Sequence, residues 1–306
     1  MTTTETRAAA APHLDPERKH DFVFHFDVRD GNPNGDPDAG GMPRTDPETQ
    51  QGLVTDVAIK RKIRNMVTLL GEGKPGYDIY VEAGVALNAQ HKRAYTTLGL
   101  KESDGKPKGY RPPPSDQATA QRWMCETFYD VRMFGAVMST GKALCGRVQG
   151  PLQISFSRSV SPVLSQEHGL TRVTQTREED IAKGETTEMG AKHAIPYGLY
   201  VGYGHFSAPL AARTGVTSQD LATLWRAFTL MLEHDRASTR GEMTLRGLYV
   251  FTHADKFGAA PAQTLFDRIT VTPAGQQPPR SYTDYTVHLP ADSDLPDGIV
   301  LTRVCG

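Results

Sequence analysis

An acidic, glycine-rich loop contains residue types that could bind a metal ion. The sequence DGNPNGDPDAGG, residues 30–41, directly follows the phenylalanine-rich run FVFHF. Its first half has the Asp, Asn, Asn and Gly spacing that begins a calcium-binding EF-hand loop. The second half departs from that pattern, because Gly41 stands where a bidentate Glu is needed and Pro33 and Pro37 stiffen the chain. A calcium site is therefore disfavoured.

Asp36 and Asp38 leave a second metal hypothesis open. A catalytic magnesium ion typically uses one or two carboxylates together with substrate phosphates. Asn, Asp, Gly and Pro are also the residues that build tight turns, and this structural role is the favoured interpretation. No H-E-x-x-H motif or P-loop is present, and no Ser/His/Asp arrangement can be identified. We therefore predict no catalytic residue, no metal site and no cofactor.

A run of basic residues could instead bind a polyanion. The sequence KRKIR, residues 60–64, has four positive charges in five positions, and Lys60 and Arg64 are one helical turn apart. Lys and Arg contacts to phosphate give affinity without base identity, which suits a protein that holds many different sequences. The alternative is a solvated helix face on which Asp56 pairs with Lys60.

The composition of the whole chain limits the classes of protein that must be considered. With 306 residues and 38% hydrophobic content, the chain can form one large globular domain or two small ones. Its formal net charge of -1 means that any nucleic-acid binding must come from local patches. The three cysteines form no C-x-x-C pair, and no signal peptide or membrane span is evident, so we expect a cytoplasmic protein without membrane contact. Residues 1–20 are expected to be a disordered tail.

Hydrophobic periodicity predicts the elements that position these residues. FVFHFDV alternates as a half-buried strand, and Phe22, Phe24 and Phe26 on one face are interpreted as buried core instead of a base-stacking platform. A helix is expected from Leu53 to Leu70, with Ile59, Ile63, Met66 and Leu70 on one apolar stripe. Later strands are predicted at residues 77–87, 130–138, 150–158, 197–206 and 246–253, and helices at 115–129 and 218–233.

Two segments read as insertions in this α+β pattern. Residues 100–115 are rich in Gly, Pro and Lys, and we interpret them as a mobile basic insertion without regular structure. Residues 161–195 are polar and mixed in charge. The turn-prone segment STGKALCGRVQ joins the strands predicted at 130–138 and 150–158.

Four segments in order carry a resemblance to a known family. They are NPNGDPDAG followed by LVTDVAIKRKIR, then DVRMFGAVM, then GRVQGPLQISFSRS, then MGAKHAIPYGLYVGYGHFSA. This order closely resembles the backbone subunit of type I-C CRISPR surveillance complexes (Cascade), the Cas-seven (Cas7) family of the RAMP superfamily, over roughly residues 20–255. The D-x-x-x-F-G motif at Asp130, Phe134 and Gly135 is shared more broadly among related backbone proteins.

The resemblance implies a fold and a set of contact residues. An RRM-like (ferredoxin-like) palm would span residues 21–306, with a basic fingers insertion at about 88–115 and a thumb hairpin at 161–195. Met189 would act in the thumb as an apolar wedge against bases. Target DNA would meet Lys101, Lys106, Lys108 and Arg111. The expected RNA contacts are Asn34, Arg44, Thr55, Lys60, Arg61, Arg64, Lys142, Arg147, Gln149 and Met189.

The resemblance also implies a role without catalysis. The protein would polymerise helically along a CRISPR guide RNA and present the spacer for pairing with target DNA in antiviral defence. Its partners would be further copies of itself, a Cas-five-type subunit that processes the repeat handle, a large PAM-reading subunit and small subunits. The competing hypothesis is a metal-dependent ribonuclease that uses Asp36 and Asp38, because type III relatives cut target RNA with an Asp in a loop of this region.

Overall fold

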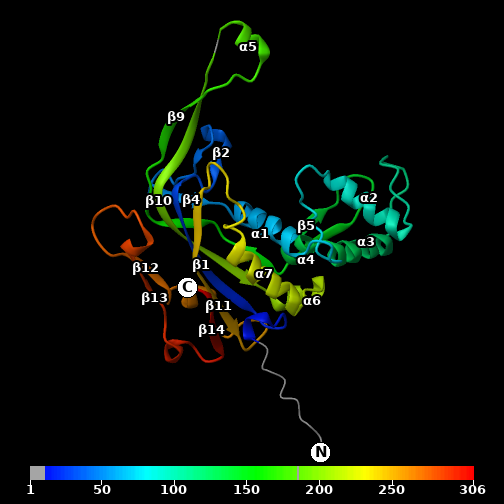
Figure 1. Cartoon of the computed structure of the whole chain (residues 1–306). Coiled ribbons are helices and arrows are strands. Elements are labelled where there is room, and N and C mark those ends of the chain that lie inside the picture. Colours follow the sequence, from blue (N-terminus) through cyan, green and yellow to red (C-terminus); the bar gives the residue numbers. More distant parts are fainter. Residues whose placement is uncertain (1–10, 185) are drawn as a thin grey trace, which may run out of the picture.

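A large antiparallel sheet lies at the centre of the computed structural model, which describes residues 11–184 and 186–306 (Figure 1). The central strand is β1, which pairs with β10 on one side and with β11 on the other. The expected mixture of helices and strands is confirmed. From edge to edge the strands are β14 (Ile299–Cys305), β11 (Glu242–His253), β1 (His20–Gly31), β10 (Glu188–Phe206), β8 (Ser157–Pro162) and β4 (Gln51–Val54), and β7 (Leu152–Ile154) and β9 (Gln166–Arg172) also pair with β10.

One face of the sheet carries the main hydrophobic core. Phe22, Phe24 and Phe26 are fully buried there, as predicted. Phe22 meets Phe228 nearly edge-on with the ring centroids 5.5 Å apart, an arrangement that stabilises beyond the buried area alone. Two helices that pack on each other cover this face, α1 (Asp56–Leu70) and α7 (Ser218–Leu230).

Helix α1 begins three residues after the predicted start at Leu53. Leu53 belongs to β4, and Thr55 takes the N-cap position, where its hydroxyl oxygen accepts a hydrogen bond from the Ala58 backbone N–H. The predicted stripe is otherwise confirmed, since Ile59 and Ile63 are fully buried. The last long helix ends at Leu230, earlier than predicted, and its apolar face is buried as expected.

The second face of the sheet is also covered, so the prediction of a half-buried strand is wrong. Val23, His25 and Asp27 are buried on this face of β1. Val23 belongs to a separate hydrophobic cluster with Phe251 and residues from the C-terminal part of the chain. The sequence pattern predicted no helix or strand beyond residue 253. In the structure this segment includes α8 (Ala262–Phe266), β12 (Thr270–Pro273) and β13 (Tyr285–His288).

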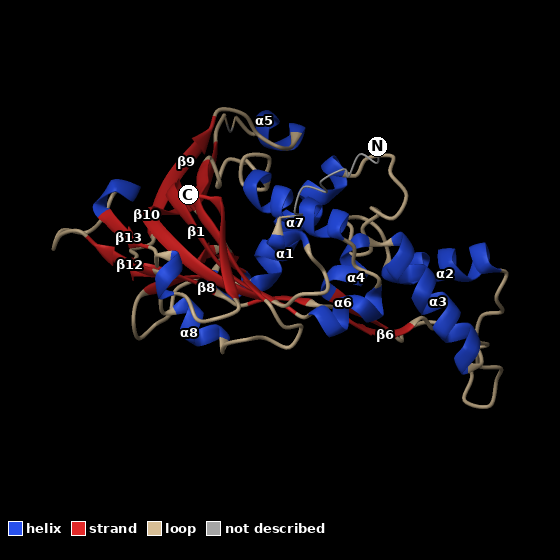
Figure 2. Ribbon diagram, turned by 90° about the horizontal axis from the view of Figure 1, so that it is seen from below, coloured by secondary structure: helices blue, strands red, loops and turns tan. Residues whose placement is uncertain are grey.

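Residues 87–149 form a lateral subdomain beside the sheet, with a hydrophobic cluster of its own (Figure 2). The insertion predicted at about 88–115 lies within this subdomain, in which α3 and the following hairpin share the cluster with α2. Figure 2 shows α2 and α3 on the opposite side of the molecule from β12 and β13. The elements of this subdomain are α2 (Leu87–Leu98), α3 (Pro114–Thr127), α4 (Tyr129–Phe134), β5 (Gly135–Met138) and β6 (Gly146–Gln149).

One predicted strand in this part of the chain is wrong, and a second is confirmed only in its C-terminal half. Residues 77–87 contain no regular strand, only an isolated bridge from Asp78 to Phe128, and Leu87 begins a helix. Residues 130–138 divide into α4 and β5, because Gly135 has a φ of 82° that ends the helix. A side chain at Gly135 would also collide with the backbone of β6, where its Cβ would lie 2.5 Å from the Val148 oxygen.

Residues 161–195 contain a protruding two-stranded arm, which Figure 1 shows extending away from the sheet. The arm pairs β9 with the first part of β10, so β10 begins at Glu188 and not near residue 197 as predicted. Every described residue from Gln166 to Ala191 is exposed or only partly buried. The short helix α5 (Glu178–Ala182) lies at the tip.

The predicted disordered tail of residues 1–20 falls partly outside the described residues, which begin at residue 11. The part that is described contradicts the prediction, because Pro12–Leu14 forms a 3-10 helix and His20 starts β1. Trp225 Nε1 donates a hydrogen bond of 3.0 Å to the His13 carbonyl and so holds this segment against α7. The remaining elements are α6 (Ala208–Thr214), β2 (Gly35–Asp36), β3 (Met42–Pro43) and the 3-10 helices Pro37–Ala39, Tyr282–Asp284 and Asp292–Asp294.

Candidate functional site

The glycine-rich loop holds the start of α1 in place. The Asn34 Oδ1 atom accepts hydrogen bonds from both the backbone N–H and the hydroxyl of Thr55, each 3.0 Å long. Thr55 is itself the N-cap of α1. Asn34 and Thr55, two of the predicted RNA contacts, are therefore hydrogen-bonded to each other. These bonds hold the chain in place where it enters α1.

The two carboxylates of the same loop have different surroundings. Asp36 Oδ2 lies 3.3 Å from the Arg44 guanidinium, and Asp36 Oδ1 accepts a hydrogen bond from the Asp38 backbone N–H. The Asp38 side chain points to no described partner and is exposed. Arg44, a predicted RNA contact, is engaged with Asp36. Within residues 11–184 and 186–306, no group of three or more His, Cys, Asp or Glu side chains could hold a metal ion.

The basic run of α1 is largely paired inside the protein. Lys60 forms the ion pair with Asp56 that the alternative interpretation predicted, at 3.2 Å, and also donates to Gln153. Arg64 pairs with Asp130 at 2.7 Å, and both residues are mostly buried. Lys60 and Arg64 lie together over the Phe134 ring, as their helical spacing predicted.

Two cations of α1 remain, and they differ in exposure. Lys62 is buried and paired with Asp235, and burial lowers the pKa of its ammonium group although Asp235 opposes that shift. Arg61 is exposed and donates only to the neutral Asn65 side chain, at 3.0 Å. Of the four charges of KRKIR, Arg61 is therefore the one that an external anion can reach without displacing a carboxylate.

The β5–β6 hairpin presents its polar side chains outward. Arg147 and Gln149 alternate with Val148, which is buried in the core of the lateral subdomain, so both polar side chains point to the opposite face. The Arg147 and Gln149 side chains are exposed. Lys142 is also exposed, but it lies in the turn beside Ser103, whose backbone N–H donates to the Lys142 carbonyl.

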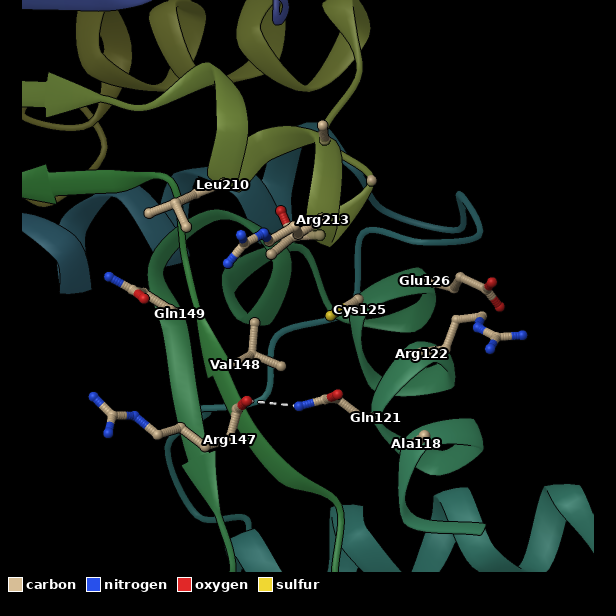
Figure 3. A pocket seen from close by; sticks show the side chains of 13 residues that line it. Ala118, Gln121, Arg122, Cys125, Glu126, Arg147, Val148, Gln149, Leu210 and Arg213 are labelled. Carbon is tan, nitrogen blue, oxygen red and sulfur yellow. Dashed lines mark hydrogen bonds between the residues drawn. The ribbon is translucent and has the colours of Figure 1, made fainter. Parts of the chain in front are cut away.

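A cleft of about 760 Å³ adjoins β6 and contains charged residues that the sequence did not single out (Figure 3). Arg213 from the last turn of α6 and Arg122 from α3 line it together with Arg147. Figure 3 shows Val148 pointing from β6 toward α3, the Arg147 and Gln149 side chains on the opposite side of β6, and the Arg122 and Glu126 side chains on α3. Gln121 Nε2 donates a hydrogen bond of 2.6 Å to the Arg147 carbonyl and ties β6 to α3.

Arg213 and Arg122 could not be recognised from the sequence as partners of Arg147. Residue 213 is 66 positions beyond Arg147, in a short helix that was not predicted. A weak signal was available in APLAART, a short alanine-rich run with a cation at its C-terminal end, which is typical of the last turn of a helix. The Cys125 thiol also lines the cleft, and burial raises its pKa to about 11, so it stays protonated.

The basic segment predicted at residues 100–115 contains no helix or strand up to residue 113, but Pro114 begins α3 and local contacts close the loop. The Tyr110 carbonyl accepts from the Ser103 hydroxyl, the Tyr110 backbone N–H donates to Asp104, and the Lys101 ammonium lies 4.5 Å from the centre of the Tyr110 ring. The four predicted DNA contacts are all exposed: Lys101, Lys106, Lys108 and Arg111.

The electrostatic character of the lateral subdomain differs from that of the whole chain. Residues 87–149 contain ten Lys and Arg against five Asp and Glu, a net charge of +5 in a chain of net charge -1. The arm has the opposite sign, with four Lys and Arg against six Asp and Glu in residues 161–195. Met189, the predicted wedge, is 82% exposed on that arm, where it pairs in register with Thr171.

Comparison with known proteins identifies related chains. A family model described as CRISPR-associated protein Cas7 matches residues 18–290. The chain is 27% identical over 232 residues to the CRISPR-associated protein Cas7 of Haloferax volcanii, an alignment that covers 68% of this chain and 64% of that protein's length.

Solved structures also show similarity. A chain of a CRISPR RNA-guided surveillance complex in a pre-nicking state has a TM-score of 0.49 and 15% identity, with 79% of each chain covered. A chain of another CRISPR RNA-guided surveillance complex has a TM-score of 0.45 and 13% identity, with 79% of this chain and 71% of that chain covered. In the part of the chain that the structure describes, no helix is both long and apolar enough to span a bilayer.

Proposed function

The chain belongs to the CRISPR-associated Cas7 family, and from this premise we propose that it is a non-catalytic, guide-RNA-binding backbone subunit of a type I-C surveillance complex. The observation that carries the proposal is the pair of exposed side chains on β6, Arg147 and Gln149, on a subdomain of net charge +5. Guanidinium groups bind phosphate oxygens in a bidentate manner, and contacts to phosphate carry no base identity. Such a surface suits a protein that must hold any spacer sequence.

The binding mode that we propose uses phosphate contacts and leaves the bases free. Arg61 on α1, together with Arg147, Gln149 and Lys142, would contact the guide backbone. Lys60 and Arg64 would contribute less, because Asp56 and Asp130 already neutralise them. The bases would then remain available for pairing with target DNA, since RNA-guided recognition delegates sequence reading to base pairs.

The finer architecture is part of the same proposal. The central sheet with α1 and α7 would be an RRM-like palm, the lateral subdomain the fingers, and the arm the thumb. Many copies would stack along one guide, with the exposed Met189 of one thumb pressed against the RNA on its neighbour. Lys101, Lys106, Lys108 and Arg111 would meet target DNA, and a Cas-five-type subunit, a large PAM-reading subunit and small subunits would complete the assembly.

The experiment that tests this function is co-expression of the chain with a CRISPR array and its processing subunit, followed by purification and sequencing of nuclease-resistant RNA. We expect protected spacer-length RNA without sequence preference. A matched preparation with Arg147→Glu should lose most of the protected RNA, whereas Arg226→Glu, which changes an exposed arginine on α7, should retain it. Nucleic-acid-free protein in the parent preparation would contradict the proposal.

A further inference from the structure

The central sheet ends at β14, a strand that is paired on one side only. Its partner is β11, and no strand of the described ranges pairs with its other side. The opposite edge of the sheet differs, because the loop before β4 covers that strand and the Leu53 N–H donates to the Arg44 carbonyl. A row of backbone N–H and C=O groups without a partner is a template on which a further strand can pair.

The hydrogen bonds of β11 show which groups of β14 face outward. The His253 N–H of β11 donates to the Lys19 carbonyl, on the side of β1. Backbone direction alternates along an antiparallel strand, so the N–H and C=O of Phe251 also point toward β1. Phe251 pairs with Leu301, and the N–H and C=O of Leu301 therefore point away from β11. The same holds two residues later, at Arg303.

The side chains of β14 are compatible with a neighbouring strand. Arg303 is the only charged residue from Ile299 to Cys305, and this run contains no proline. Val300 is 46% exposed, and Thr302 is partly buried. The register with β11 is regular from Ile299 to Arg303, since its one shift, next to Leu248, comes after these residues. Charges, prolines and bulges normally prevent strand addition at a sheet edge, and this stretch has a single charge.

A second copy of β14 fits this edge in one register. Antiparallel pairing about a two-fold axis at Thr302 places Leu301 of each copy opposite Arg303 of the other. These are the residues whose backbone groups point outward, so each pair exchanges both of its hydrogen bonds. Thr302 then lies opposite Thr302 of the second copy, and threonine pairs stabilise adjacent strands.

The neighbouring registers are less favourable. An axis at Arg303 would place two guanidinium groups directly opposite each other, and like charges in that position are destabilising. An axis at Leu301 would pair Arg303 with Ile299, whose N–H already donates to the Pro296 carbonyl at 3.2 Å. The register centred on Thr302 has neither conflict.

We propose that β14 pairs with β14 of a second copy of this chain, so that two RNA-free chains form a two-fold dimer with one sheet continuing across the interface. Main-chain hydrogen bonds supply the affinity in this mode of association. A two-fold contact uses the same surface on both chains and closes, whereas head-to-tail stacking along a guide repeats. The dimer is therefore a state of the chain separate from the proposed assembly on RNA, and none of the proposed RNA contacts lies on β14.

The test is sedimentation velocity of the full chain, expressed without a CRISPR array and freed of nucleic acid, over a series of concentrations. We expect a monomer–dimer equilibrium for the parent. Arg303→Pro removes an outward N–H and no hydrogen bond within the sheet, and it should raise the dissociation constant of the dimer at least about tenfold. Arg303→Ala is the matched control, because it keeps the N–H and should keep the dimer.

Two substitutions at the axis test the register. Thr302→Lys and Thr302→Glu each place like charges opposite each other, with the Cα atoms about 4.5 Å apart, and each variant alone should be monomeric. An equimolar mixture of the two variants should restore the dimer, because the opposed charges then attract. Far-ultraviolet circular dichroism of each variant should match that of the parent.

Each outcome bears on the proposal. A parent that stays monomeric at every concentration, or that forms open oligomers, overturns the inference and leaves the proposed RNA-binding function unaffected. A dimer that persists in Arg303→Pro and in both Thr302 variants lies on another surface, and this result also overturns the inference. A mixture of the Thr302 variants that stays monomeric overturns the two-fold register. If the Thr302 variants fail to fold, the comparison of Arg303→Pro with Arg303→Ala still decides whether the edge of β14 is the interface.

Discussion

Three of the four cations of α1 differ in their electrostatic role from the cations beside β6. On α1, Lys60, Lys62 and Arg64 each have a carboxylate partner within the protein, at Asp56, Asp235 and Asp130. On β6 and α6, Arg147 and Arg213 have no such partner among the described residues. The first group therefore contributes to stability and the second is available to a ligand. Whether a cation is available depends on which acidic residues the fold brings near it.

The pair of Arg64 and Asp130 shows how a basic residue becomes structural. Asp130 is nearly fully buried, and its carboxylate accepts hydrogen bonds from Arg64 Nε and from the backbone N–H groups of Tyr80 and Val81. Arg64 is on α1 and Asp130 is on α4, so the pair joins the main core to the lateral subdomain. A buried carboxylate satisfied in this way is costly to disrupt, because each donor left behind loses its partner.

The largest expected effect is therefore a loss of stability, and it comes from removing the carboxylate that pairs with Arg64 of α1. Asp130→Ala should lower the free energy of unfolding by about 3–5 kcal/mol, because it leaves Arg64 without its counter-charge and two backbone N–H groups without an acceptor. Urea unfolding monitored by circular dichroism would measure the loss. Asp38→Ala, at an exposed carboxylate, is the control and should change stability by less than about 0.5 kcal/mol. A loss below about 1 kcal/mol for Asp130→Ala would contradict the structural role.

The contrast also explains how much could be predicted from the sequence. Local periodicity predicted β1, α1, α3 and α7, because each contains its own alternation or apolar stripe. It could not predict that Asp130, 66 residues after Arg64, neutralises that arginine, since helix spacing reports only neighbours on one helix. The pair of Lys60 and Asp56 was accessible to such reasoning and was anticipated as an alternative.

The errors in the fold have related physical causes. The segment predicted as a strand at residues 77–87 has strand-like composition, but its backbone does not join a sheet. The Tyr80 and Val81 N–H groups donate to the Asp130 carboxylate, and the Asp78 carbonyl accepts from the Tyr129 N–H. The second layer on the sheet was missed because residues 254–299 contain only short elements with weak periodicity. Arg213 was missed because the relation between α6 and β6 is tertiary.

The second prediction tests Arg147 and Arg213, the arginines without a carboxylate partner beside β6. Reversing two of them in Arg147→Glu/Arg213→Glu should weaken single-stranded RNA binding about a hundredfold, because two favourable phosphate contacts become repulsive. Fluorescence anisotropy at one fixed salt concentration measures this. The control Arg226→Glu/Arg303→Glu changes net charge by the same amount at exposed positions away from the cleft. Equal losses in both double variants would mean that overall charge, and not this cleft, determines affinity.

A third prediction concerns two buried histidines, His25 and His20, of which His20 has hydrogen-bond partners in Thr252 and the Asp15 carbonyl. His25 is fully buried, and neither ring nitrogen has a partner among the described residues. Burial lowers its pKa to about 4, and the pKa of His20 is lowered to about 4 chiefly for the same reason. Because these pKa values lie below the ordinary 6.5, the unfolded chain binds more protons as the pH falls. Stability should therefore decrease between about pH 7 and pH 5, by about 2 kcal/mol for each histidine.

Replacing His25 by Leu should remove about half of this pH dependence and leave the rest to His20. Urea unfolding at the two pH values gives the measurement. His288→Gln, at an exposed histidine on β13, should keep the parent profile. If His25→Leu kept the full pH dependence, burial of the His25 ring would not be a cause of that dependence.

The smallest expected effects separate two neighbours on α1. Arg61→Gln should leave the free energy of unfolding within about 0.5 kcal/mol of the parent and weaken RNA binding about threefold, because Arg61 is exposed and has no carboxylate partner. Lys60→Gln should weaken RNA binding less, since Lys60 would have to leave Asp56 before it could reach a phosphate. Parallel anisotropy titrations compare the two directly. A larger effect at Lys60 would mean that the ion pair with Asp56 breaks when RNA binds. The ion pairs of α1 would then belong to the RNA-free protein, and the cations of α1 would be as available to RNA as those beside β6.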